Sequence, residues 1–307
     1  MILCCGEALI DFLPRKTAEG GVAYQPFCGG SVYNTAIALG RLGQPVGLFT
    51  GVSMDFFGDM LREGLAASHV RLRFTKVWDR PSTLAFVKLT DGHARYSFFD
   101  ENSAGRMLTR RDLPKLGQQV AALHFGSISL ISEPGGSTLE ALMKRESAKR
   151  VISLDPNIRP SQIKDRRSHL ARLRRLIAMT DILKLSDEDV IWMTGKDDAR
   201  VAARKWLRLG AKLVLVTRGA GGVEAFTRSL HLQRPAEKVK VADTVGAGDT
   251  FTAGLLSALR QRGLLAKRGI AAISETDLAA ALEFASRAAA ITCSRPGADP
   301  PWARELA

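Results

Sequence analysis

Short apolar runs alternate with amphipathic stretches over most of this chain, and this alternation constrains the fold more than any other feature. The apolar runs predict buried strands at residues 2–5, 46–50, 121–125, 151–154, 182–185 and 213–217. The amphipathic stretches predict helices at residues 32–41, 56–66, 137–149, 166–179, 199–208, 250–261 and 277–292. Strands that are buried on both faces and separated by helices require a mostly parallel sheet covered on each side. The sequence therefore predicts a doubly wound α/β fold.

Residues 71–100 break this alternation and predict antiparallel β-structure. The expected strands are residues 71–78, 83–90 and 94–99. Asp91-Gly92 between the last two is a strong signal for a hairpin turn. With residues 12–27 these strands would form a small β-sheet beside the main one. Since no repeat or linker divides the chain, we expect a single domain, residues 1–307, with a β lid formed by about residues 12–28 and 71–106.

The charge balance is the one extreme of the composition, with 44 Lys and Arg against 31 Asp and Glu, a net charge of +13. Such a balance fits nucleic acid, an anionic small molecule or simply a basic background. The basic residues are scattered, and no aromatic run is interleaved with them to stack bases, so we do not expect nucleic acid as a partner.

The cysteines and the start of the chain bear on where the protein acts. The four cysteines show no metal-binding spacing and are typical of buried thiols in a reducing compartment. No stretch of about 20 apolar residues predicts a membrane span. The apolar start lacks a basic leader and is expected to be a strand rather than a signal peptide. We therefore expect a cytoplasmic protein without a membrane partner.

The segment Asp243-Thr244-Val245-Gly246-Ala247-Gly248-Asp249 carries the strongest chemical signal. Its small residues let backbone N–H groups point one way, and the helix that follows adds its positive end, which suits a phosphate. Asp249 at the rim is placed to accept a proton from an attacking hydroxyl. Read alone, the segment also fits a glycine-rich turn with an aspartate cap. A dinucleotide site is disfavoured by Phe251, and a Walker A loop by the lack of a following lysine.

A second segment, Gly29-Gly30-Ser31-Val32-Tyr33-Asn34-Thr35-Ala36, opens a predicted helix. The glycine pair permits close approach of the backbone to a ligand. Asn34 offers a donor and an acceptor to sugar hydroxyls, and Asp11, just beyond the first strand, would accept from paired hydroxyls. Taken singly, an ordinary helix start and an ordinary turn explain these residues as well.

Together the two segments resemble the motifs of the ribokinase-like carbohydrate kinases, also called the PfkB family. That family has an N-terminal Gly-Gly motif ending in Asn-x-Ala and a C-terminal Asp-Thr-x-Gly-Ala-Gly-Asp motif. Both occur here in that order, and the resemblance covers essentially the whole chain. It implies a ribokinase-like fold with a β-sheet lid and an enzyme that uses ATP with Mg²⁺. Many relatives also bind a monovalent cation, so the resemblance implies a site for a cation such as K⁺.

The resemblance assigns roles to residues by their position in the motifs. Asp249 corresponds to the catalytic base, and the amides of Gly246, Ala247 and Gly248 to the anion hole. Asp11, Gly30 and Asn34 correspond to the residues that bind the sugar, and Phe98, Asn102 and Arg159 are further residues that we expect to contact it. Those expected to meet the nucleotide are Lys184, Ser186, Thr217, Gly219 and Gly222. Asp189 replaces the glutamate through which many members organise Mg²⁺, so we expect it to act on the metal indirectly. The positions that hold the monovalent cation, mostly through backbone carbonyls, are Asp243, Val245, Thr292, Arg295 and Gly297.

The choice of sugar depends on weaker signals. Several stretches, among them residues 6–11, 99–104 and 155–160, are most similar to bacterial fructokinases, which implies phosphorylation of fructose to fructose 6-phosphate. A 2-keto-3-deoxygluconate kinase, with Arg106 or Arg159 meeting the acid, stays open, as do other sugar or nucleoside kinases of the family. A phosphofructokinase would need inward cations from Arg71, Arg73, Arg80 and Arg95. From another class, a non-catalytic sugar- or nucleic-acid-binding module is the alternative.

The lid sequence favours a neutral sugar. Phe86, Tyr96 and Phe98 share strand parity within their own runs and are expected to cover the sugar with one face of the lid. Phe98 and Asp100 would point inward and Phe99 outward. The outward face would meet solvent or a second subunit, which predicts a homodimer through the β lid.

Overall fold

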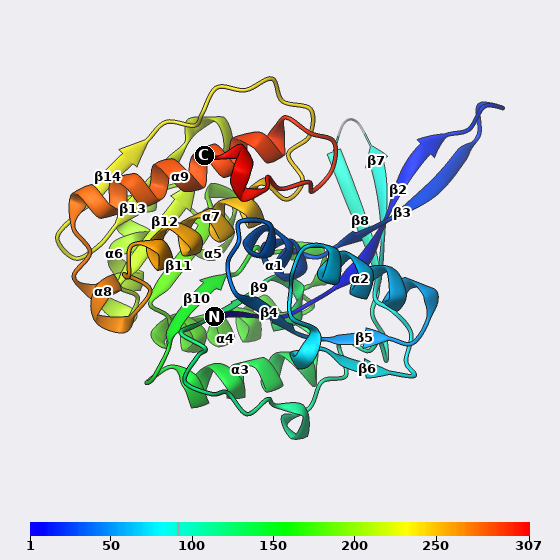
Figure 1. Ribbon diagram of the computed structural model, residues 1–307, viewed down its shortest axis with the longest axis horizontal. Helices are drawn as coiled ribbons and strands as arrows, with labels where there is room; N and C mark the ends of the chain where they lie inside the picture. Colours follow the sequence, from blue (N-terminus) through cyan, green and yellow to red (C-terminus); the bar gives the residue numbers. More distant parts are fainter. Residues whose placement is uncertain (91–92) are drawn as a thin grey trace.

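The protein, seen here in a computed structural model, is described for residues 1–90 and 93–307, with the side chains of residues 88–96 outside that description. Its centre is an eight-stranded sheet in the order β14-β13-β12-β11-β10-β9-β1-β4 (Figure 1). The bounds are β1 Ile2–Cys5, β4 Val46–Phe49, β9 Ala122–Gly126, β10 Val151–Asp155, β11 Ile182–Ser186, β12 Leu213–Thr217, β13 Val223–Phe226 and β14 His231–Arg234. Six neighbouring strands of this sheet, β12, β11, β10, β9, β1 and β4, run parallel to one another, and β13 and β14 add an antiparallel edge. The predicted mostly parallel sheet is confirmed, together with all six predicted strands.

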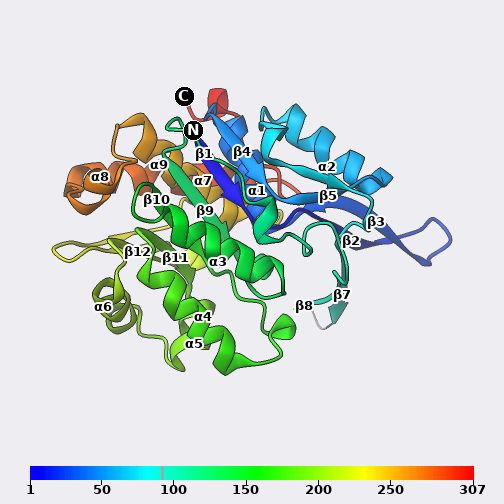
Figure 2. The ribbon, with the colours of Figure 1, turned by 90° about the horizontal axis from the view of Figure 1, so that it is seen from below.

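Helices cover both faces of this sheet (Figure 2). One face carries α1 (Ser31–Arg41), α7 (Ala247–Gln261), α8 (Lys267–Ala271) and α9 (Glu275–Cys293), and the other carries α3 (Gly135–Glu146), α4 (Arg166–Ala178), α5 (Asp187–Thr194) and α6 (Ala199–Leu209). Alternate residues of a strand therefore enter different cores: Ile2 and Cys4 pack with α1, α7 and α9, and Leu3 and Cys5 with α3, α4 and α6. Among the described residues, no helix joins enough length to enough apolarity to cross a membrane.

A second sheet projects from one side of the molecule (Figure 1). It has the order β3-β2-β7-β8, with β2 Leu9–Lys16, β3 Val22–Gly29, β7 Leu84–Thr90 and β8 His93–Phe99. The pairs β2–β3 and β7–β8 are antiparallel, whereas β2 and β7 are parallel. The expected small sheet is present, and α2 (Phe56–Ala67) packs against β2 and β3. The predicted Asp91-Gly92 turn lies outside the described residues.

Residues 71–78 do not belong to this second sheet, so that part of the predicted lid is wrong. They form a short 3₁₀ turn, Leu72–Phe74, and β6 (Lys76–Trp78), which pairs in parallel with β5 (Gly51–Ser53). The reason is Phe74, whose side chain is buried against Gly47 of the main sheet. Burying this ring holds the segment against β4. After β3, the chain therefore rejoins the second sheet only at Leu84.

Phe86 and Phe98 lie on opposite faces of the second sheet, which corrects the predicted inner face. Ala85 pairs with Phe98, whereas Phe86 pairs with Ser97. The Phe86 ring stacks on Phe12 with 4.6 Å between ring centroids, on the face away from Phe98. The prediction of which residues share a face within each strand is correct, but the register between the two strands decides which rings of β7 and β8 share a face. The side chain of Tyr96 lies outside the described part.

Candidate active site

A cleft of about 1460 Å³ lies at the carboxyl ends of the parallel strands, the edge where open α/β sheets bind ligands. Residues that end or follow β1, β9, β10, β11 and β12 line it, and the second sheet and the start of α7 complete the wall. The structure brings most predicted site residues to this cleft: Asp11, Gly30, Asn34, Phe98, Arg159, Lys184, Ser186, Asp189, Thr217, Gly219, Gly222, Val245, Gly246, Ala247, Gly248 and Asp249.

Two predicted residues near the lid do not reach this cleft. Asn102 is exposed in a turn after β8, with φ of 56°, and its carbonyl oxygen accepts a hydrogen bond from Arg80. Asp100 does not point inward, because its carboxylate pairs with Arg106 at 3.0 Å and accepts from Ser132 at 2.9 Å. Asn102 is thus separated from the other residues expected to bind the sugar.

The residues predicted to form the anion hole lie at the start of α7. Gly246 caps the helix with φ of 77°, and the helical ladder begins with the Thr250 N–H bonded to the Gly246 carbonyl at 2.8 Å. The amides of Ala247, Gly248 and Asp249 precede that ladder, and Ala247 makes a long 3.3 Å bond to the Thr244 carbonyl. Such early N–H groups and the positive helix end attract a phosphate.

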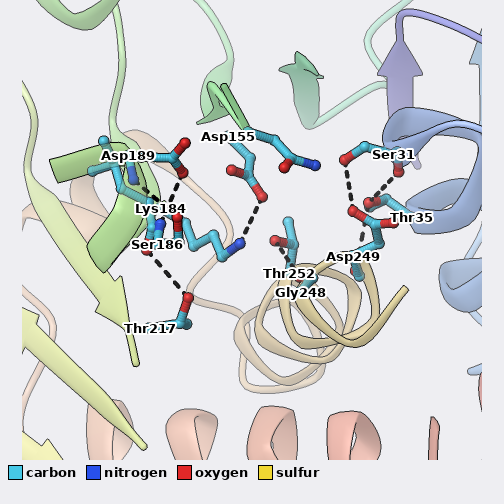
Figure 3. Close-up of polar contacts among 12 residues, drawn as sticks. Ser31, Thr35, Asp155, Lys184, Ser186, Asp189, Thr217, Gly248, Asp249 and Thr252 are labelled. Atoms are coloured by element: carbon cyan, nitrogen blue, oxygen red, sulfur yellow. Dashed lines mark hydrogen bonds and ion pairs between the residues drawn. The ribbon is translucent and has the colours of Figure 1, made fainter. Parts of the chain in front are cut away.

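Lys184 places a positive charge beside these amides. A Cβ added to Gly248 would lie 3.0 Å from Lys184 Nζ, so the glycine leaves room for the ammonium (Figure 3). Lys184 Nζ donates to Asp155 Oδ2 at 2.9 Å, with only 7% and 2% of the two side chains exposed. Burial disfavours the ammonium, but the attraction and hydrogen bond of Asp155, together with the charges of Asp189 and Asp249, outweigh it and raise the pKa of Lys184. The lysine is therefore held in its charged form beside Gly248 at the start of α7.

Asp249 lies in the first turn of α7 and is held by two side chains of α1. Its Oδ1 accepts from Ser31 Oγ at 2.6 Å (Figure 3). Its Oδ2 accepts from Asn34 Nδ2 at 2.9 Å. Burial raises the pKa of Asp249 above its ordinary value, by more than these two hydrogen bonds lower it. A buried carboxylate of raised basicity in a cleft is suited to accept a proton.

The sugar-binding residues predicted near the N-terminus gather opposite α7. The Asp11 carboxylate lies over Gly29, where an added Cβ would be 2.1 Å from Asp11 Oδ2, so the first glycine of the pair makes room for it. Burial raises the pKa of Asp11 to about 6, although the Arg159 guanidinium opposes this shift. Arg159 is itself held by Asn157, whose Oδ1 accepts at 2.6 Å.

Asp189 is occupied by the backbone rather than open to a metal. Its two carboxylate oxygens accept from the Ile158 N–H at 2.8 Å and the Ser186 N–H at 2.9 Å, and its own N–H donates to Ser186 Oγ. This is a capping box at the start of α5. In residues 1–90 and 93–307, no group of three His, Cys, Asp or Glu side chains forms a metal cage. The role of Asp189 toward Mg²⁺ stays a prediction.

The residues expected around a monovalent cation lie together beside the cleft. Asp243 joins the two segments, because its carboxylate accepts from the N–H groups of Val245 at 3.0 Å and Gly297 at 2.9 Å. Thr292 is buried and bonds through its hydroxyl to Thr250 of α7. The Arg295 side chain turns away to Asp299 and Glu305. Of this group only Val245 lines the cleft.

Three further residues of the site were not assigned a role from the sequence. Asp155 ends β10 and pairs with Lys184, Ser31 bonds to Asp249, and Glu7 lines the cleft with its Oε2 buried and without a hydrogen-bond partner in the described residues. Asp155 could have been found, because a carboxylate at the carboxyl end of a buried parallel strand lies at the ligand edge. Ser31 and Glu7 carry no comparable local signal.

Comparison with known proteins gives consistent matches. The model of the pfkB family of carbohydrate kinases matches residues 1–304. A fructokinase of Rhizobium leguminosarum bv. trifolii is 54% identical over 278 residues, which cover 91% of this chain and 85% of that protein. The crystal structure of a Xylella fastidiosa fructokinase with bound ATP superposes with a TM-score of 0.90 at 28% identity, covering 99% of this chain and 96% of that one. A Vibrio cholerae O395 fructokinase in a fructose-, ADP- and calcium-bound form gives 0.83 at 25% identity, covering 97% and 94%.

Proposed function

This chain belongs to the PfkB family of carbohydrate kinases, and from that premise we propose that it transfers the γ-phosphate of ATP to fructose and forms fructose 6-phosphate. The observation that carries the proposal is the buried Asp249 carboxylate at the amino end of α7, beside open amides and the Lys184 ammonium. A base, an anion hole and a fixed cation within one cleft are the parts that phosphoryl transfer needs.

The reaction follows from this arrangement. The acceptor hydroxyl attacks the γ-phosphorus in line, a new P–O bond forms to the sugar, the bond to the β-phosphate oxygen breaks, and ADP leaves. Asp249 takes the hydroxyl proton, while the amides of residues 246–248 and Lys184 stabilise the charge on the transferring group. Mg²⁺, when bound to the phosphates, supplies further neutralisation of that charge.

The two substrates occupy different ends of the cleft in this proposal. Ser186, Thr217, Gly219 and Gly222 lie at the ends of β11 and β12 and serve the nucleotide. Asp11, Gly30, Asn34, Phe98 and Arg159 lie toward the second sheet and serve the sugar. We place K⁺ at the junction of residues 243–245 with 292–297, where backbone carbonyls are close at hand.

The charges at the sugar end favour a neutral hexose over an anionic substrate. Glu7, Asp11 and Asp249 all face this end, and Arg159 is the cation that lies near Asp11. Arg106, a candidate to meet a sugar acid, is bonded to Asp100 and to the Glu133 carbonyl and does not line the cleft. Arg71, Arg73 and Arg80 do not line it either, and the side chain of Arg95 lies outside the described part.

The second sheet serves as a lid in this proposal and also as the contact of a homodimer. Its inner face brings Asp11 and Phe98 to the cleft. The opposite face exposes aromatic side chains at Tyr24 of β3, Phe99 of β8 and Phe56 of the neighbouring α2. Light scattering after size exclusion tests the dimer: wild type at twice the chain mass, and Phe99→Asp at the chain mass, support it. The cytoplasmic location stays a prediction from the cysteine usage.

A coupled assay of ADP release tests the proposed activity. The panel contains fructose, ribose, 2-keto-3-deoxygluconate, fructose 6-phosphate and adenosine, each with ATP and Mg²⁺, and Asp249→Asn is the matched control. Release that depends on fructose and is lost in Asp249→Asn supports the proposal. Preference for a sugar acid or a sugar phosphate rejects fructose but keeps a sugar kinase. No sugar-dependent release, with salt-sensitive DNA binding, would instead indicate a binding module.

A further inference from the structure

One face of α1 forms a polar cradle around the base. Ser31, Asn34 and Thr35 are spaced at i, i+3 and i+4, so their side chains project from the same side of the helix. Ser31 Oγ lies 2.6 Å from Asp249 Oδ1, Asn34 Nδ2 lies 2.9 Å from Asp249 Oδ2, and Thr35 Oγ1 lies 3.4 Å from the Asp249 carbonyl. Ser31 and Thr35 both point toward Asp249 (Figure 3). Each carboxylate oxygen therefore has its own donor from α1.

The position of Ser31 is fixed by groups outside its side chain. Gly30 caps α1 with φ of 102° and offers no side-chain acceptor, so another residue must satisfy the first N–H groups. Glu7 does so from the segment after β1, since its Oε1 accepts from the Val32 N–H at 3.3 Å. The Ser31 carbonyl accepts from Thr35 Oγ1 at 3.0 Å, and Ser31 is only 8% exposed. The Ser31 hydroxyl is thus held in a fixed position relative to the Asp249 carboxylate.

We infer that Ser31 is a positioning residue for phosphoryl transfer, whose hydroxyl holds the Asp249 carboxylate in the orientation that accepts the substrate proton. This inference rests on the proposed function, because it assigns Asp249 as the base. Asn34 alone fixes one oxygen and leaves the carboxylate able to turn about its last side-chain bond. The Ser31 hydroxyl fixes the second oxygen and so fixes the plane.

The same hydrogen bond affects the charge on the base. A donor to the ionised carboxylate lowers its pKa, so loss of the Ser31 hydroxyl raises the pKa of Asp249. The charged groups that face Asp249 are Asp155 of β10, Lys184 of β11, Asp11 of β2 and Glu7 after β1. Substitution of Ser31 changes none of them. A shift of the acidic limb of the pH profile therefore reports on Ser31 itself.

Ser31→Ala is the test, with Ser257→Ala as the matched control. Ser257 is a fully buried serine of α7 two turns beyond Asp249, and its hydroxyl accepts from Gln261. In Ser31→Ala we expect kcat to fall roughly 10-fold, because a hydrogen bond to a charged group is lost. The pKa that governs the acidic limb of the kcat/KM pH profile should rise by roughly 1 pH unit. KM for sugar and for ATP should stay within about twofold, Ser31→Thr should recover kcat, and Ser257→Ala should behave as wild type.

Three results would overturn the inference. An unchanged kcat and an unchanged acidic limb in Ser31→Ala would show that the hydroxyl does not hold the base. A rise in KM for the sugar with kcat unchanged would assign Ser31 to the sugar instead. An equal loss in Ser257→Ala would show a general packing effect.

A second readout separates this inference from the proposed function. The ¹³C carboxyl resonance of Asp249, assigned by its loss in Asp249→Asn, can be followed against pH without any substrate. An upward shift of its titration midpoint in Ser31→Ala supports the contact even if no sugar is phosphorylated. An identical midpoint in wild type and Ser31→Ala rejects it, whatever the activity of the enzyme.

Discussion

Asp155→Asn is the substitution whose effect the structure predicts most sharply. Asp155 Oδ2 accepts from Lys184 Nζ at 2.9 Å, and both side chains are almost fully buried. The amide retains the shape of the carboxylate but removes its charge, which leaves the buried ammonium of Lys184 without its ion-pair partner and with the attraction of Asp189 and Asp249 alone. Breaking a buried ion pair by removing one partner costs about 3–5 kcal/mol.

That cost converts into a measurable change in thermal stability. One kcal/mol moves the Tm of a large domain by about 2–4 °C, so we expect the Tm of Asp155→Asn to fall by roughly 6–20 °C. Burial then acts on Lys184 against the attraction of Asp189 and Asp249 alone, so the pKa of Lys184 falls and the positive charge beside Gly248 is held less firmly. We therefore also expect kcat to fall by about 10-fold, since the lysine is no longer held in place by Asp155 to stabilise the transferring phosphate.

Differential scanning fluorimetry and the ADP-release assay measure the two effects. The matched control is the double variant Asp155→Asn with Lys184→Met, which removes the stranded charge as well. Because apolar replacement of a buried pair is often neutral or stabilising, its Tm should recover most of the loss while its activity stays low. A Tm within about 1 °C of wild type for Asp155→Asn, or no recovery in the double variant, would refute the reasoning.

Three further substitutions test the roles of single residues. Asp249→Asn should lower kcat by about 10²–10⁴-fold with KM for ATP nearly unchanged, and retention of more than half of kcat in steady-state kinetics contradicts the base assignment. Asp11→Ala should raise KM for fructose and leave KM for ATP unchanged. In wild type, Asp11 has a pKa of about 6 and takes up a proton as the pH falls through that value, so KM for fructose should rise below pH 6. A KM for fructose that does not change with pH contradicts the assignment. Gly246→Ala should lower both Tm and kcat, because Gly246 has φ of 77° and the new Cβ would lie 2.7 Å from the Ala298 Cβ. An unchanged Tm in scanning fluorimetry would show that the turn tolerates a side chain.

Much of the main sheet could be predicted because its signal is local. Strands buried on both faces must be apolar throughout, so six short apolar runs marked β1, β4, β9, β10, β11 and β12. The edge strands β13 and β14 were not predicted, since an edge hairpin is half exposed and carries polar residues such as Glu224 and Arg234. The amides at the start of α7 could be predicted for a similar reason, because small residues at a helix start act through their own backbone; their role as an anion hole stays a prediction.

The side-chain contacts of the site were decided only by the tertiary structure. Ser31 and Asn34 reach Asp249 across more than 200 residues of sequence, and Lys184 meets Asp155 because β10 and β11 are neighbours in the sheet. The sequence assigned Asn34 to the sugar, and only the structure shows that its amide also donates to the Asp249 carboxylate. Residue types and local spacing determine which chemical groups the chain carries and which ends of elements present them. The pairing of those groups depends on strand order, register and helix packing, and these are set by burial of the whole core rather than by any one segment.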